Sequence, residues 1–162
     1  MNWIEELLYD YPTLPKKICD KKTELLLYTR HKNDFFEGAK ISNKENSSVK
    51  FIVEGIKTDP THDAYMTYEK LIDRVKKDID KLEQDKLLVE KWMQTGEQAI
   101  LTAQERLIIE LRYFKRCSWF AVSIKANYNE RWCKQINKNL LQKIKKHFNT
   151  APNSTLLDLY YT

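Results

Sequence analysis

Glycine and proline are scarce in this chain of 162 residues, which contains three glycines and four prolines. Both residue types interrupt helices, so their scarcity leaves long stretches in which a helix can continue. Charged residues make up 31% of the sequence, which is a high share. The composition therefore predicts an all-α, largely exposed architecture, built as one domain or as a small domain with an extended helical part.

Long apolar runs are also missing. No stretch has the roughly 20 apolar residues that a transmembrane helix needs, and no secretory signal peptide is recognisable. Cysteine and histidine occur three times each, and neither has the spacing of metal ligands or of a disulfide framework. We expect a reduced cytoplasmic protein that holds no metal. The cysteines are Cys19, Cys117 and Cys133, and the histidines are His31, His62 and His147.

Signatures of catalysis are absent as well. The sequence has no glycine-rich phosphate loop, no Gly-x-Ser-x-Gly, no His-Glu-x-x-His and no plausible Cys/His relay. Its many carboxylates alternate with lysines on helical faces, where solvation and pairing along the helix explain them. We therefore expect a protein that is not an enzyme and has no cofactor.

Apolar residues recur at steps of three or four over residues 2–31, which predicts helix. Pro12 and Pro15 divide this stretch into a short first helix and a second one that begins near Leu14 or Pro15. Residues 32–60 are rich in Asn, Ser and Lys and are expected to form a flexible polar loop. An apolar patch lies within that loop at Phe51, Ile52, Val53 and Ile56.

Asp59 and Pro60 mark the start of a long helix, with Asp as its cap and Pro as its first residue. The apolar residues of this helix alternate at steps of three and four, the heptad pattern of a coiled coil. The N-terminal helix could pack antiparallel on this seam within one chain, or two copies could form a homodimer through it. The seam consists of Tyr65, Tyr68, Ile72, Val75, Ile79, Leu82, Lys86, Val89 and Met93. Residues 1–96 are thus interpreted as a helical scaffold or oligomerisation region.

Residues 97–148 are predicted to form a helix-turn-helix domain, followed by a tail at 149–162. Thr102 and Glu105 have the spacing of a capping box at the start of its first helix. The apolar run that follows is Leu107, Ile108, Leu111 and Phe114. Ser118 can cap a second helix, in which one face carries Trp119, Val122, Ser123 and Ala126.

The turn before the third helix carries Asn127, where such turns usually have glycine. Asparagine tolerates the left-handed backbone conformation that the turn needs. Asn129 can then cap the third helix. Inward-facing residues of that helix are expected at steps of three and four, namely Cys133, Ile136, Leu140 and Ile144.

Positive charge is concentrated in this C-terminal part. The net charge is +5, but residues 112–147 carry ten Lys or Arg side chains against one acid, whereas residues 1–111 have a balance of −3. A local positive field is what counterion release from phosphate requires, so the segment is expected to bind double-stranded DNA. No helix pairs its basic face with a broad exposed apolar one, which disfavours a membrane surface.

The outward side of the third helix would present Glu130, Arg131, Lys134, Gln135 and Lys138. Arg and Lys bind guanine edges and phosphates, and Gln can contact adenine through two hydrogen bonds. We expect bases to be read by Arg131, Lys134 and Gln135. Phosphates would be held by Arg116, Lys125 and Lys138.

A residue pattern links the three helices of this domain. It comprises Leu101, Thr102, Glu105, Arg106, Ile108, Arg112, Tyr113 and Phe114, followed by Gln135 and Ile136 in the last helix. The pattern resembles region 4 of bacterial sigma factors, in which the early outward positions of the last helix read the −35 element of a promoter. The resemblance implies a base-reading role for Glu130, Arg131, Lys134 and Gln135. Asn127, Trp132 and Cys133 depart from the family pattern, so the bases that are read do not follow from it.

The order of segments is similar to that of RinA/ArpU-type late transcription regulators of phages and mobile elements. It combines a short N-terminal helix, a polar segment, Thr58-Asp59-Pro60-Thr61 before a long helix, and the sigma-like unit at the end. The resemblance implies an activator of late genes that binds promoter DNA and acts with the RNA polymerase of its bacterial host. The protein could also be a repressor, because activation or repression depends on where its binding site lies relative to the promoter.

Two further functions fit parts of the sequence. A small terminase subunit also combines a helix-turn-helix with coiled-coil helices, although its DNA-binding unit usually comes first. A helical interaction module without DNA binding could instead use the basic unit to contact an acidic partner.

Overall fold

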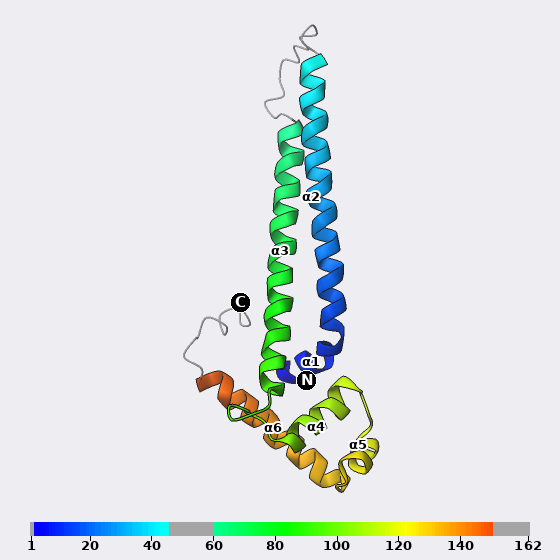
Figure 1. Ribbon diagram of the computed structural model, residues 1–162, viewed down its shortest axis with the longest axis vertical. Coiled ribbons are helices and arrows are strands. Elements are labelled where there is room, and N and C mark those ends of the chain that lie inside the picture. Colours follow the sequence, from blue (N-terminus) through cyan, green and yellow to red (C-terminus); the bar gives the residue numbers. More distant parts are fainter. Residues whose placement is uncertain (1, 46–59, 151–162) are drawn as a thin grey trace. The chain divides into compact units, whose positions relative to one another are not determined.

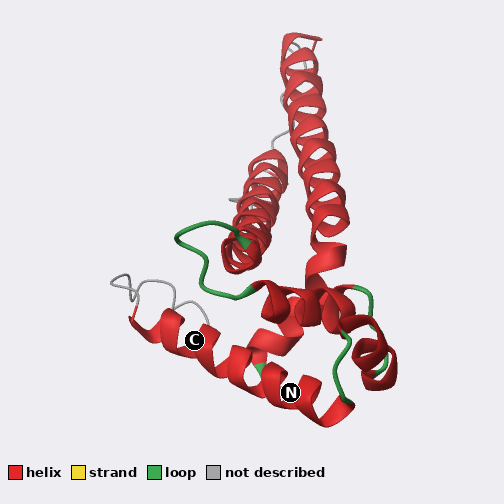
Figure 2. Cartoon of the chain, turned by 60° about the horizontal axis from the view of Figure 1, so that its bottom comes forward, coloured by secondary structure: helices red, strands yellow, loops and turns green. Residues whose placement is uncertain are grey.

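A computed structural model describes residues 2–45 and 60–150, with side chains described outside 35–45, 60–65 and 149–150. These residues form helices and no strand, which confirms the predicted all-α class (Figure 2). Within the described part of the chain, no helix is long and apolar enough to cross a membrane. The chain divides into two compact units, Pro15–Glu83 and the combination of Met1–Leu14 with Gln84–Thr162.

Two long antiparallel helices build the unit Pro15–Glu83. α2 (Leu14–Glu45) and α3 (Pro60–Met93) run side by side (Figure 1). Their apolar residues at heptad spacing are buried, among them Ile18 on α2 and Val75 on α3. Ile72 and Ile79 of the predicted seam are buried in the same way. The seam therefore packs within the chain in this unit, which is one of the two arrangements expected from the sequence.

Ion pairs between the two helices fix their register. Lys32 Nζ lies 2.8 Å from Glu69 Oε1, and Lys21 Nζ lies 3.5 Å from Asp78 Oδ2. Such partly exposed pairs contribute at most about 1 kcal/mol each, so the apolar seam supplies most of the stability. The ion pairs favour this antiparallel register of α2 and α3 over registers that are shifted along the helices.

α2 is longer than the sequence indicated. Residues 32–45 continue the helix, whereas a polar loop was expected from residue 32 onward. Weak helix formers such as Gly38 cost up to about 1 kcal/mol each. Extending an existing helix avoids a new nucleation step, and the lysine, glutamate and alanine residues of the segment favour extension. Residues 46–59, with the predicted apolar patch and the Asp59 cap, lie outside the described residues.

The second unit begins with α1 (Trp3–Asp10) and a 3-10 turn, η1 (Tyr11–Thr13). The break at the prolines is thus confirmed. Ile4, Leu7 and Leu8 of α1 are buried, as are Val89 and Trp92 in the last turns of α3.

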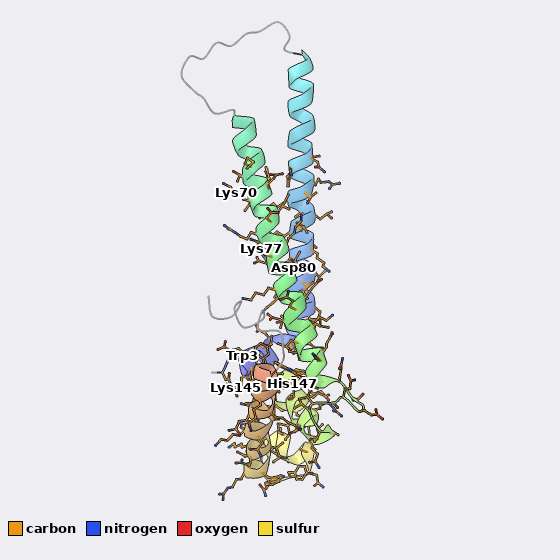
Figure 3. All side chains as sticks on the ribbon, turned by 90° about the vertical axis from the view of Figure 1, so that its left-hand side faces the viewer. Trp3, Lys70, Lys77, Asp80, Lys145 and His147 are labelled. Atoms are coloured by element: carbon orange, nitrogen blue, oxygen red, sulfur yellow. The ribbon has the colours of Figure 1, made fainter. Side chains whose placement is uncertain are left out.

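An aromatic cluster joins these N-terminal residues to the C-terminal helices. The Trp3 ring lies 6.3 Å from that of Trp92 and 5.1 Å from that of Phe148. Figure 3 shows Trp3 close to the C-terminal end of α6. α1 and the last turns of α3 thus belong to the same compact unit as the C-terminal helices.

The remaining elements of this unit are α4 (Ala103–Ile109), a π-helical turn η2 (Glu110–Phe114), α5 (Trp119–Ala126) and α6 (Glu130–Thr150). The core-facing side of α4 is centred on Ile108 and Ile109, and Leu107 is 37% exposed. The wider winding of the π turn then buries Tyr113, whereas Phe114 stays half-buried. The apolar run predicted from the sequence therefore wrongly included Leu107, and it missed Ile109 and Tyr113.

Candidate nucleic-acid interface

The capping box predicted at the start of α4 is confirmed. The Thr102 N–H donates to Glu105 Oε2 at 2.7 Å, and the Glu105 N–H donates to Thr102 Oγ1 at 3.3 Å. Glu105 also accepts a hydrogen bond from Lys143 Nζ at 3.0 Å, which ties α4 to α6. Burial alone would raise the pKa of Glu105, but the hydrogen bonds from Thr102 and Lys143 lower the pKa below its ordinary value. One carboxylate thus fixes both the start of α4 and its contact with α6.

The turn between α5 and α6 has the conformation expected from Asn127. Its φ of 57° and ψ of 41° place this residue in the left-handed region. The Tyr128 N–H donates to the Ser123 carbonyl at 3.1 Å, and the Asn127 N–H donates to the Ile124 carbonyl at 3.3 Å. This pair of bonds is a Schellman motif, which ends α5 and satisfies its last carbonyls.

Side-chain caps set the first turns of α5 and α6. Ser118 Oγ accepts a hydrogen bond from the Ala121 N–H at 3.2 Å, and Asn129 Oδ1 accepts one from the Trp132 N–H at 2.7 Å. Both caps were predicted from the sequence. Together with the Schellman turn, they join α5 and α6 through the short turn Asn127–Asn129, of the length found in a helix-turn-helix.

The inward side of α6 is apolar except at one position. Cys133, Leu140 and Ile144 are buried as predicted, whereas Ile136 is only half-buried. Asn137 is buried beside them, and no sequence pattern had indicated it.

The buried amide of Asn137 has a specific partner. The hydroxyl of Tyr113 lies 3.0 Å from Asn137 Oδ1 and 3.2 Å from Glu5 Oε1. Burial raises the pKa of Tyr113 far above its ordinary value, so the phenol stays protonated and can donate a hydrogen bond. The interaction connects η2, α6 and α1 through polar groups inside an apolar core.

Two arginines at the edge of the unit are engaged in its structure. The guanidinium of Arg112 lies 4.8 Å from the ring centre of Trp119 and donates to the Cys117 carbonyl at 2.9 Å. Arg116, an expected phosphate contact, has a φ of 52° and donates to the Tyr9 carbonyl at 3.3 Å. Arg116 is nevertheless exposed, so its remaining N–H groups face solvent.

The predicted base-reading residues gather at the start of α6. Arg131 is exposed there, as is Lys134, whose ammonium forms an ion pair with Glu130 at 2.5 Å. Gln135 is exposed and its Nε2 donates to Asn139 Oδ1 at 3.0 Å. Glu130 therefore neutralises one lysine of the face, while the charge of Arg131 is free of any carboxylate partner among the described residues.

The two other expected phosphate contacts lie on different helices. Lys138 is exposed on α6, one helical turn after Lys134. Lys125 is exposed near the end of α5, with its Nζ 4.0 Å from Cys117 Sγ. The structure thus brings Arg131, Lys134 and Lys138 onto one side of one helix, with Lys125 on the helix before it.

The basic side of α6 continues beyond Lys138, the last residue that was predicted to contact DNA. Arg131, Lys134, Lys138 and Lys145 are all exposed and recur at helical spacing, with Gln142 between the last two. At about 1.5 Å per residue, this basic stripe is about 21 Å long. Lys145 lies near the C-terminal end of α6 (Figure 3). The three-four spacing could have identified Lys145, since it continues the same row.

The arrangement can hold a polyanion by charge and read polar edges by hydrogen bonds. A B-DNA major groove is about 12 Å wide and admits one α-helix, and the exposed side of α6 carries donors for phosphates and bases. No group of His, Cys, Asp and Glu suited to a metal ion occurs among the described residues.

The chain belongs to the family described as "Protein of unknown function (DUF722)", which matches residues 1–146. The match takes in the long helices α2 and α3 as well as the basic stripe. No curated protein and no solved structure matches the chain.

Proposed function

We propose that this member of the DUF722 family is a sequence-specific DNA-binding protein that regulates transcription. The observation that carries the proposal is the two-sided character of α6. Its inward side is anchored by Cys133, Leu140 and Ile144, and its outward side is the basic stripe. A helix that is held rigidly by its apolar side and exposes a row of cations fits a groove lined by phosphates.

The preceding turn supports this proposal. In a helix-turn-helix, the second helix enters the major groove and its first turns contact base edges. Here the Asn129 cap fixes the first turn of α6, and Arg131 and Gln135 would occupy positions where such helices contact bases. Exposed cations on both helices, Lys125 and Lys138, would hold phosphates on either side.

Base reading and phosphate binding are assigned to different residues. Arg131 offers a planar, always charged group that matches guanine, whereas Lys134 shares its charge with Glu130. In this proposal Lys134 reaches a base or a phosphate only when its ion pair with Glu130 is broken. Arg116 would bind phosphate through the N–H groups that do not donate to the Tyr9 carbonyl.

The likeness to sigma factor region 4 and to RinA/ArpU-type regulators supports a narrower role. In this proposal the protein activates late genes of a phage or mobile element, bound beside the promoter and acting with the host RNA polymerase in the bacterial cytoplasm.

Selection from a pool of random duplexes, with the full-length protein, tests DNA recognition. We expect a common motif to be enriched, and the Arg131→Ala/Gln135→Ala variant to bind the enriched duplex at least about tenfold more weakly. Lys77→Ala removes one exposed positive charge on α3 and serves as the control, with affinity close to wild type. A pool that converges on no motif, or a double variant with wild-type affinity, contradicts the proposal.

Footprinting on the DNA that surrounds the gene, with and without RNA polymerase, tests the narrower role. Protection that overlaps a promoter and becomes stronger with polymerase is the expected result. Protection confined to a packaging site, together with a ring of many subunits in light scattering, would instead indicate a terminase subunit.

A further inference from the structure

The first turn of α6 carries an exposed tryptophan beside the predicted base-reading residues. Trp132 is 52% exposed, although the tryptophans Trp3 and Trp92 of the same unit pack in an aromatic cluster. The Trp132 N–H is held by the Asn129 cap, so the backbone beneath the indole is fixed. The indole offers apolar surface to a ligand that docks on the outward side of α6, and covering that surface would be favourable.

Trp132 shares one row of α6 with two amides. Gln135 follows it by three residues and Asn139 follows Gln135 by four, so the three side chains lie along one edge of the outward side. All three are exposed. The basic stripe runs next to this row, which we call the amide row.

The hydrogen bond within the amide row determines what it can bind. Gln135 Nε2 donates to Asn139 Oδ1 at 3.0 Å, which leaves Gln135 Oε1 as an acceptor and Asn139 Nδ2 as a donor. If both amides are turned over, the bond reverses and one donor and one acceptor are again left. The linked pair therefore presents one of each in either orientation.

Adenine offers the complementary pair of groups in the major groove, an N6 donor and an N7 acceptor. Its partner thymine carries a methyl group in the same groove, and an apolar side chain is what contacts that methyl group. Trp132 and Gln135 are about one helical turn apart on the same edge of α6, close enough to contact the same base pair or neighbouring ones.

Resting on the proposed function, we propose that the amide row is a specificity-determining site for A·T pairs. Gln135 and Asn139 together bind one adenine edge, and Trp132 packs against the methyl group of a thymine at the same or a neighbouring pair. Arg131 and Lys138 border the row, and these cations favour a polyanion over an apolar protein surface at the indole.

The experiment uses the full-length protein and the duplex that it enriches from a random pool. Each adenine of the motif is replaced in turn by 7-deazaadenine, which lacks the N7 acceptor, and each thymine by uracil, which lacks the methyl group. We expect about a tenfold loss of affinity at one or more adenines. The loss expected at one or more thymines is about fourfold, the effect of one buried methyl group.

Variants assign these losses to residues. Gln135→Ala/Asn139→Ala should bind the 7-deazaadenine duplex and the parent duplex equally, and Trp132→Ala should no longer distinguish uracil from thymine. The three side chains are exposed, so thermal unfolding of either variant should match wild type. Gln84→Ala removes an exposed amide on α3 and should keep both sensitivities.

The outcomes separate the two levels of the proposal. Enrichment of a motif whose binding is indifferent to both base analogues overturns the amide row and leaves DNA recognition intact. Variants that retain the full wild-type sensitivity overturn it as well. Failure to enrich any duplex overturns the proposed function and the amide row together.

Discussion

The hydroxyl of Tyr113 lies 3.0 Å from Oδ1 of Asn137, inside the core that holds α6. Asn137 is 7% exposed, so its amide needs a partner from the protein. The two residues come from η2 and α6, and their contact constrains the rotation of α6 about its own axis. Because that rotation decides which side chains face outward, the pair couples the core to the basic stripe.

Removing this hydroxyl should destabilise the protein. Tyr113→Phe keeps the ring but leaves the Asn137 amide buried without its partner, a loss of about 1–3 kcal/mol in the free energy of unfolding. Urea denaturation followed by circular dichroism measures it. Adding Asn137→Leu should restore part of the loss, since both polar groups are then gone. Wild-type stability for Tyr113→Phe alone would show that the hydrogen bond contributes nothing.

Asn127 should respond to substitution according to its left-handed backbone. Asn127→Gly is expected to be neutral or slightly stabilising, because glycine adopts a φ of 57° without strain. Asn127→Val should cost about 1–2 kcal/mol, since a β-branched residue disfavours this region. Thermal unfolding of the two variants gives the comparison, and equal midpoints for glycine and valine would contradict it.

The charge of Glu105 should make stability depend on pH. Its folded-state pKa is lowered from 4.5, so the ionised form stabilises the fold above that pH, and the contribution is lost as the pH falls through the lower folded-state value. Glu105→Gln keeps a capping side chain but removes the charge. We expect the variant to be less stable than wild type at pH 7, with the difference shrinking toward pH 3. A difference that stays constant across this range would mean that the carboxylate charge is irrelevant.

α1 should matter to the core as much as any C-terminal helix. Leu8 is fully buried in α1, and Leu8→Ala should cost about 2–5 kcal/mol. Leu26→Ala removes the same number of atoms from a leucine that is 69% exposed on α2, and should change stability by less than about 0.5 kcal/mol. Chemical denaturation of the two variants provides a matched comparison. Equal effects would show that α1 is not part of the core.

Local signals in the sequence predicted the parts of this fold that local chemistry controls. The capping box at Thr102, the caps Ser118 and Asn129, and the turn at Asn127 follow from what each side chain can do within its own few residues. The helix start at Pro60 and the heptad seam were predictable for the same reason.

Features that depend on distant partners did not follow from the sequence. Asn137 has no local signature of burial, because its partner Tyr113 comes from another element. The π turn that brings Tyr113 inward changes the helical period, so a fixed period placed the core residues of this segment incorrectly. The continuation of α2 through residues 32–45 overrode a local composition that favours a loop.

The candidate site was predicted in part. Charge and spacing identified Arg131, Lys134 and Lys138, all of which share the outward side of α6. The ion pair of Lys134 with Glu130 and the hydrogen bond of Gln135 with Asn139 depend on side-chain conformations that the sequence does not reveal.

The salt dependence of DNA binding tests the central claim most directly. Affinity of the full-length protein for a duplex should fall steeply with salt. Lys138→Ala/Lys145→Ala should reduce the steepness of log K against log salt by about two units of slope. Lys70→Ala/Lys77→Ala removes the same charge from exposed positions of α3 (Figure 3) and should leave the slope at its wild-type value. Binding that is insensitive to salt, or equal slopes for both double variants, would contradict the assignment of the basic stripe to DNA.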